Sequence, residues 1–168
     1  MKTQPNNNDL SKVKGMAEAI RIAMLTTVDG GGHLVSRPMA LQHMDDDGTL
    51  WFFTRKSSPK VDQIENNRQQ VNISFADSGD SSYVSISGTA QEMYDRAKID
   101  ELWSVAAKPW FPEGKDDPEL TLLNVHTEMA EYWDSTSSQM VRFLEMARAA
   151  VTGDTYKEGE NKKVYNNQ

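Results

Sequence analysis

Residues 50–60 read LWFFTRKSSPK, a stretch that changes character at its middle. Its first four residues are apolar or aromatic and predict a buried strand over 49–54. Three cations and three hydroxyl side chains follow over residues 54–60. The sequence therefore predicts a buried strand whose end is crowded with hydrogen-bond donors.

A short helix is predicted directly after this stretch. Ser58 precedes Pro59, and proline is favoured at the first position of a helix because the amide hydrogen it lacks would have no partner there anyway. Ser58 is therefore expected to be the N-cap of a helix over 60–67, with Val61 and Ile64 on one face.

The start of that helix has the properties of an anion site. A first turn offers unpaired amide N–H groups and the positive end of the helix dipole, and Lys60 lies within it. Thr54 and Ser57 are expected to add hydroxyl donors, and Arg37 on the neighbouring strand is placed to add a bidentate phosphate contact. The alternative, from the residues alone, is an ordinary helix start with solvated lysines.

Outward from this stretch, the chain alternates short apolar runs with turn sequences. DGGG at 29–32, DDDG at 45–48 and DSGD at 77–80 are typical of reversals between antiparallel strands. Besides 49–54, strands are expected over 20–28, 33–44, 70–76, 82–93, 119–126 and 129–135. Helices are expected from Asp9 or Ser11 to Ala19 and over 60–67, 95–107 and 138–151.

Closely spaced strands with few helical insertions predict an antiparallel β-barrel with α additions, a mainly β fold rather than a βαβ array. The glycines at 30–32 have no helix after them, so they predict a hairpin tip rather than a phosphate loop. Pro38 interrupts its strand and is expected at a sheet edge or a bulge. We expect one domain over 1–152, followed by a polar, disordered tail over 153–168.

The composition argues against several classes of protein. A formal charge of −7 and a pI near 4.9 argue against a nucleic-acid-binding domain. No apolar run approaches the roughly 18 residues of a membrane span, and the polar start MKTQPNNN does not resemble a signal peptide. There is no cysteine and the three histidines are scattered, so no metal site is expected. The expected compartment is the cytoplasm.

Residues 52–67, FFTRKSSPKVDQIENN, resemble the flavin-phosphate segment of the pyridoxamine 5′-phosphate oxidase family, the FMN-binding split barrels. SRPMALQ at 36–42 is similar to that family's Arg-containing strand, and SYVSISGTAQ at 82–91 to its central strand. Residues 109–134 more closely resemble the bacterial general stress protein branch. The resemblance runs from about residue 11 to residue 148. It implies an antiparallel split β-barrel.

The resemblance also implies a cofactor and its contacts. Arg37, Thr54 and Lys60 hold the places of the family residues that bind the FMN phosphate or ribityl chain. FMN is the expected cofactor, with FAD or a deazaflavin as the alternatives. The residues expected to bind it are Arg37, Pro38, Met39, Phe53, Thr54, Ser57, Ser58, Lys60 and Trp110.

Several positions depart from the oxidase pattern. Pro59 stands where the oxidase has an arginine, and Tyr83 where it has a flavin-contacting glutamine. Gln42 stands where it has a lysine for the substrate phosphate, a loss of about 1.5–3 kcal/mol for a charge-assisted bond. The tail ENKKVYNNQ lacks the oxidase's arginine-rich segment. Oxidation of vitamin B6 phosphates is therefore disfavoured.

The function that the resemblance implies is a flavin-binding general stress protein that acts as an oxidoreductase with a small-molecule electron donor or acceptor. The family implies a homodimer with the flavin at its interface. The Pro-flanked Trp110 is then expected near the partner's flavin, with packing of its loop on its own barrel as the alternative. No side chain stands out as an acid, a base or a nucleophile. The alternatives are a non-catalytic flavin-binding stress or sensor module and a true pyridoxamine 5′-phosphate oxidase.

Overall fold

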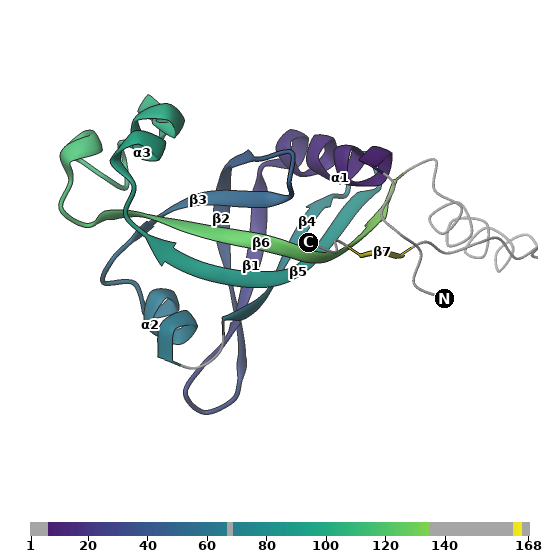
Figure 1. The fold of residues 1–168 in the computed structure, drawn as a ribbon, viewed down its shortest axis with the longest axis horizontal. Helices are drawn as coiled ribbons and strands as arrows, with labels where there is room; N and C mark the ends of the chain where they lie inside the picture. The colour runs from purple at the N-terminus through teal and green to yellow at the C-terminus, as the bar shows by residue number, and fades with distance from the viewer. Residues whose placement is uncertain (1–6, 67–68, 135–162, 166–168) are drawn as a thin grey trace, which may run out of the picture.

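The structure is a computed structural model and describes residues 7–66, 69–134 and 163–165. Six antiparallel strands close into a barrel in the order β3-β2-β1-β4-β5-β6, and β6 pairs back with β3 (Figure 1). The strands are β1 (Ile22–Val28), β2 (Leu34–Met44), β3 (Thr49–Arg55), β4 (Gln70–Asp77), β5 (Ser82–Met93) and β6 (Leu120–Trp133). The helices are α1 (Asn7–Ile20), α2 (Pro59–Asn66) and α3 (Arg96–Leu102).

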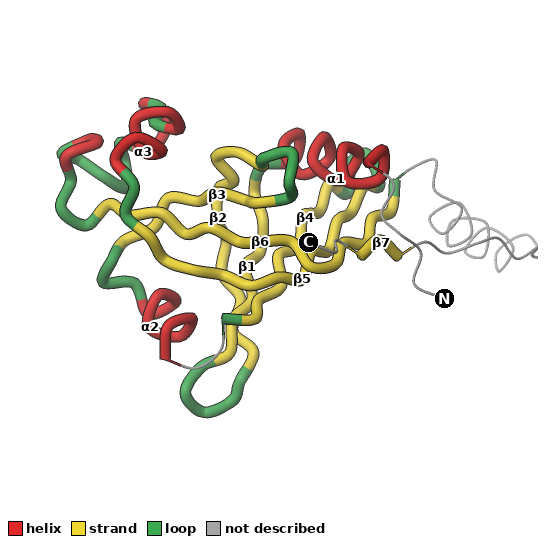
Figure 2. Tube along the Cα trace, in the orientation of Figure 1, coloured by secondary structure: helices red, strands yellow, loops and turns green. Residues whose placement is uncertain are grey.

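The main core fills the barrel because alternate strand residues point inward. Leu25 of β1, Ile73 of β4 and Ile86 of β5 are fully buried in it. Two helices extend this core from the ends of the barrel, α1 through Val13 and Ala17 and α2 through Ile64. Figure 2 shows both helices outside the ring of strands, with α2 beside the tip of the β1–β2 hairpin. The predicted mainly β fold with α additions is therefore confirmed.

The barrel is split between β2 and β3. Their pairing begins at Met44 with Leu50 and ends at Leu41 with Phe52, after which β2 stays with β1 and β3 stays with β6. Pro38 lies in this separated part of β2, where its missing N–H is compatible with an unpaired edge. The predicted edge position of Pro38 is thus observed.

A second apolar cluster lies outside the barrel, under α3 and the turns that follow it. It contains Trp51, Ile99, Ala107, Phe111, Leu120 and Leu122, with Phe53, Met93, Leu102 and Trp103 packed against it. The helix predicted over 95–107 is shorter than expected. Residue Trp103 is extended, so α3 ends at Leu102, and only Val105–Ala107 form a further 3-10 turn.

The two closing strands predicted over 119–126 and 129–135 are one strand, β6. A bulge explains the difference. Ser87 of β5 faces Met129 while the next residue, Gly88, faces Thr127, so Glu128 is an extra residue on β6. The bulge shifts the alternation of side chains without ending the strand.

The C-terminal part differs from the predicted tail at three residues. Lys163–Tyr165 form a short strand, β7, that pairs with Met129–Glu131 of β6, so disorder throughout 153–168 is wrong for these residues. The helix predicted over 138–151 and the remainder of the tail lie outside the described residues. Among the described residues, no helix combines the length and the apolar character needed to cross a membrane.

Candidate functional site

Arg37 lies on the separated part of β2 and is half-buried. Its register partner on β1 is Leu25, a fully buried core residue, so the Arg37 side chain starts on the inner face of the sheet. Arg37 Nη1 donates to Thr27 Oγ1 at 2.5 Å. Burial lowers the pKa of the Arg37 guanidinium, although a guanidinium keeps its charge in proteins.

Helix α2 brings further polar groups to Arg37. Gln63 Oε1 accepts from Arg37 Nη2 at 2.8 Å and from Thr27 Oγ1 at 2.6 Å. The three side chains therefore form a closed hydrogen-bonded triangle that links β1, β2 and α2. Val61 and Ile64, the buried residues of α2, hold the helix against the barrel.

Lys60, one turn before Gln63, is the second cation. Its Nζ donates to Ser58 Oγ at 2.7 Å. Burial lowers the pKa of the Lys60 ammonium, and the nearby positive charge of Arg37 lowers it further. Two like charges therefore lie close enough to repel each other in a partly dry environment, which is unfavourable without an anion between them.

Thr54, the second-last residue of β3, has a hydroxyl with no hydrogen-bond partner among the described residues. Its side chain is buried, at 3% exposure, and Oγ1 makes no hydrogen bond to any described residue. Buried hydroxyls are normally hydrogen-bonded, so such a group suggests a ligand or water that completes it. Thr54 and Arg37 both lie beyond the point at which β2 and β3 separate.

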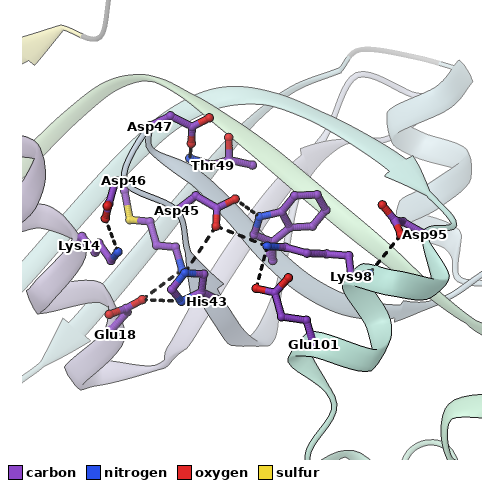
Figure 3. Close-up of polar contacts among 12 residues, drawn as sticks. Lys14, Glu18, His43, Asp45, Asp46, Asp47, Thr49, Asp95, Lys98 and Glu101 are labelled. Carbon is purple, nitrogen blue, oxygen red and sulfur yellow. Dashed lines mark hydrogen bonds and ion pairs between the residues drawn. The ribbon is translucent and has the colours of Figure 1, made fainter.

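Arg37 and Lys60 differ from the charged residues near α1 and α3, which are paired with opposite charges. Figure 3 shows a cluster near α1 and α3 in which cations and carboxylates are paired. Lys98 Nζ lies 3.5 Å from Asp45 Oδ1 and 3.2 Å from Glu101 Oε1. Lys14 Nζ lies 2.5 Å from Asp46 Oδ1.

His43 lies inside the same cluster, with Nδ1 3.0 Å from Glu18 and Nε2 3.4 Å from Asp45. Trp51 Nε1 donates to the other oxygen of Asp45 at 2.6 Å. The charges of this cluster satisfy one another. Around Arg37 and Lys60, by contrast, no carboxylate within residues 7–66 and 69–134 forms an ion pair with either cation. Arg37 and Lys60 are therefore a better candidate for an anion-binding site than the cluster near α1 and α3.

The other predicted donors have different partners. Ser57 donates from both its backbone N and its Oγ to Glu119 Oε2, at 3.2 and 2.5 Å, and these bonds lower the pKa of the Glu119 carboxyl. Ser58 does precede α2, but its Oγ accepts from Lys60. A serine N-cap would accept from a backbone amide of the first turn instead.

The apolar residues predicted around the flavin are dispersed. Met39 is buried in the main core and Pro38 is exposed on the outer side of β2. Phe53 packs against Trp103 and Phe111 in the second cluster, with ring centroids 5.8 and 6.4 Å apart. Trp110 is 66% exposed in the loop after α3, as its predicted role at an interface requires. Arg37 thus lies near enough to Lys60 for the two charges to interact, whereas Phe53 belongs to the second cluster and Trp110 to the exposed loop after α3.

Two residues of the site were not predicted from the sequence, Thr27 and Gln63. Thr27 is distant in the sequence from α2 and comes to Gln63 only through the fold. Gln63 carried a weak signal, because it lies three residues after Lys60 and therefore on the same side of the helix.

Comparison with known proteins supports the family resemblance and the fold. A family model described as pyridoxamine 5′-phosphate oxidase like matches residues 8–157. The chain is 31% identical to general stress protein 26 of Bacillus subtilis over 126 residues, 73% of this chain and 87% of that protein. It is 28% identical to the protein bli-3 of Neurospora crassa over 159 residues, 89% of this chain and 76% of that protein.

Solved structures show the same fold. The crystal structure of the general stress FMN/FAD binding protein from the phytopathogen Xanthomonas citri is similar with a TM-score of 0.63 and 33% sequence identity. The match covers 77% of this chain and 89% of that one.

Proposed function

Because the chain belongs to the pyridoxamine 5′-phosphate oxidase-like family, with general stress protein relatives, we propose that it binds a flavin through Arg37 and Lys60. The observation that carries the proposal is the pair of half-buried cations with no carboxylate partner among the described residues. A relative described as an FMN/FAD binding protein supports the choice of ligand. FMN is the flavin we propose, since its terminal phosphate is a doubly charged group.

The residues present fit a flavin phosphate. Arg37 has N–H donors beyond the two used by Thr27 and Gln63, and the Lys60 ammonium has donors beyond the one used by Ser58. The buried hydroxyl of Thr54 supplies a further group without a partner among the described residues. When bound, the flavin would supply the oxidation–reduction chemistry, while these residues would anchor its phosphate.

The absorption spectrum of the purified protein, followed by mass analysis of any small molecule released by heat, tests the proposal. We expect a flavin spectrum and the release of FMN. A colourless protein that takes up neither FMN, FAD nor a deazaflavin from solution would rule it out.

We further propose that the bound flavin serves an oxidoreductase with a small-molecule electron donor, in the cytoplasm. The side chains bonded to Arg37 and Lys60 are two hydroxyls and an amide, none of them a ready acid or base, which suits a site that anchors rather than transfers protons. Oxidation of NADH or NADPH by the holoprotein is the expected activity. Flavin binding without such turnover would indicate the non-catalytic stress or sensor module instead.

The unpaired hydroxyl of Thr54 gives a prediction that separates stability from binding. Thr54→Val keeps the shape of the side chain and removes a buried polar group with no described partner, so we expect the flavin-free protein to become about 1 kcal/mol more stable. Its affinity for FMN should fall. Chemical denaturation of the flavin-free protein and titration with FMN measure the two effects.

Thr121 is the matched control for Thr54. It faces Thr54 across β3 and β6 and is equally buried, but its Oγ1 donates to Glu92 and to the carbonyl of Met93. Thr121→Val should therefore destabilise the protein by about 1–3 kcal/mol, because it leaves acceptors unsatisfied. Equal losses of stability in both variants would contradict the unpaired state of Thr54.

The proposal includes a homodimer with the flavin at its interface. Trp110 and Val105, at 66% and 78% exposure, leave large apolar side chains in solvent on the loop after α3. Sedimentation should show a dimer at micromolar concentration, and Trp110→Ser should weaken it at least about tenfold, since buried tryptophans dominate interfaces. Monomers of the parent protein under these conditions would refute the dimer.

A further inference from the structure

Gln63 is the acceptor that two donors of the anion site share. Its Oε1 lies 2.8 Å from Arg37 Nη2 and 2.6 Å from Thr27 Oγ1. A guanidinium can only donate hydrogen bonds, so Arg37 fixes the orientation of the Gln63 amide, with oxygen toward the cation. In turn, two acceptors, Thr27 Oγ1 and Gln63 Oε1, fix two of the guanidinium nitrogens. The direction of the Arg37 side chain is therefore set by neutral partners.

The neutrality of Gln63 matters more than its shape. A glutamate would fit the same space and would bind Arg37 more strongly, since carboxylates form charge-assisted and often bidentate pairs with arginine. It would also cancel the charge that an anionic ligand needs. Helix α2 does carry acids directly beside this position, Asp62 and Glu65, but both are exposed. The acids of α2 thus face solvent, and an amide faces Arg37.

We propose that Gln63 is a positioning residue that holds Arg37 in place without neutralising it, so that Arg37 and Lys60 keep two uncompensated charges for the ligand phosphate. This inference rests on the proposed flavin site and assigns a role to a residue that does not itself carry the charge. It predicts that adding one carboxylate at position 63 raises the stability of the fold and lowers the affinity for the ligand. Substitution of a residue with a merely structural role would change stability and affinity in the same direction.

Gln63→Glu is the decisive variant. In the full-length flavin-free protein we expect FMN affinity to fall at least about tenfold, riboflavin affinity to stay within about twofold, and the melting temperature to stay equal or rise. Asn66→Asp adds the same charge at an exposed position of the same helix, and it should leave both affinities within about twofold of the parent. Gln63→Met, which has no acceptor and no charge, should weaken FMN by less than Gln63→Glu.

The outcomes separate this inference from the flavin site itself. If the parent protein binds FMN no more tightly than riboflavin, the proposed phosphate anchor is wrong. If the parent prefers FMN but Gln63→Glu keeps that preference, or loses FMN no more than Gln63→Met, the role of a neutral Gln63 is overturned. Equal loss of FMN and riboflavin with a lower melting temperature would also overturn it, because Gln63 would then act only in the fold. A selective loss of FMN at unchanged or higher stability supports it.

Discussion

Replacing Lys60 with methionine is expected to weaken FMN binding about ten- to a hundredfold while leaving riboflavin binding nearly unchanged. Riboflavin has the same ring system without the phosphate, so a selective loss assigns the defect to the phosphate anchor. The size follows from the roughly 1.5–3 kcal/mol that a hydrogen bond to a charged group contributes. Calorimetric titration of the flavin-free protein with each ligand measures both affinities.

The same substitution is expected to stabilise the flavin-free protein. Burial and Arg37 lower the pKa of Lys60 in the fold, so the folded state binds its proton less readily than the unfolded chain does. The resulting destabilisation is fully present below the lowered pKa and disappears as the pH rises toward the ordinary value of 10.5. Lys60→Met should therefore raise the melting temperature at neutral pH and flatten the rise in stability between neutral and alkaline pH.

Lys56→Met is the matched control, since Lys56 is exposed and its ammonium lies over the Tyr94 ring, 5.0 Å from its centroid. It should bind FMN within about twofold of the parent. Arg37→Met should lower the affinity for FMN as Lys60→Met does, and by a larger factor if the guanidinium makes a bidentate contact. If Lys60→Met binds FMN like the parent, the anchor is not at this end of the barrel.

Gly88→Ala is expected to destabilise the protein by roughly 3 kcal/mol or more, a large part of the roughly 5–15 kcal/mol by which a domain is stable. A Cβ at this position would lie 2.0 Å from the carbonyl oxygen of His126 and 2.9 Å from its carbonyl carbon. Both are backbone atoms of β6 at the bulge, so no side-chain rotation relieves the contact. Only a separation of β5 from β6 would.

Gly15→Ala provides the opposite outcome with the same chemical change. Gly15 lies within α1, and a Cβ there meets nothing within 4 Å. Alanine in an exposed helical position should therefore stabilise the protein by roughly 0.5–1 kcal/mol. Urea unfolding curves of the two variants measure both effects. A Gly88→Ala protein as stable as the parent would show that the β5–β6 pairing is looser than described.

The strands were predictable because their signals are local. Alternation of apolar and polar residues identified β4 and β5, and the turn sequences between strands fixed the hairpins; Gly32 has the positive φ of 84° expected at the first of them. The continuity of β6 was not predictable. It depends on a bulge opposite Gly88, and a bulge is specified by the partner strand, not by the residues that form it.

In the site, too, residues with a local sequence signal could be predicted and contacts between distant segments could not. Arg37 and Lys60 could be proposed for the site because charges beside an apolar strand and a helix start are visible in the sequence. The contact of Gln63 with Arg37 and the bond from Ser57 to Glu119 could not be predicted, since both join segments far apart in the chain. Helical spacing also extended the third helix past Leu102, because periodicity carries no information about the extended backbone of Trp103.

The closure of β3 onto β6 has a consequence for the order of events during synthesis. Residues 49–55 emerge from the ribosome early and cannot form their pairing with β6 until residues 120–126 have been translated. The loop before α2 also lacks partners until then, because Lys56 N donates to the Glu119 carbonyl and Ser57 to the Glu119 carboxylate. Pairings between distant segments form late in folding. The proposed flavin site is therefore expected to form only after β6 has been translated, so that flavin would bind to finished chains and not to ribosome-bound fragments.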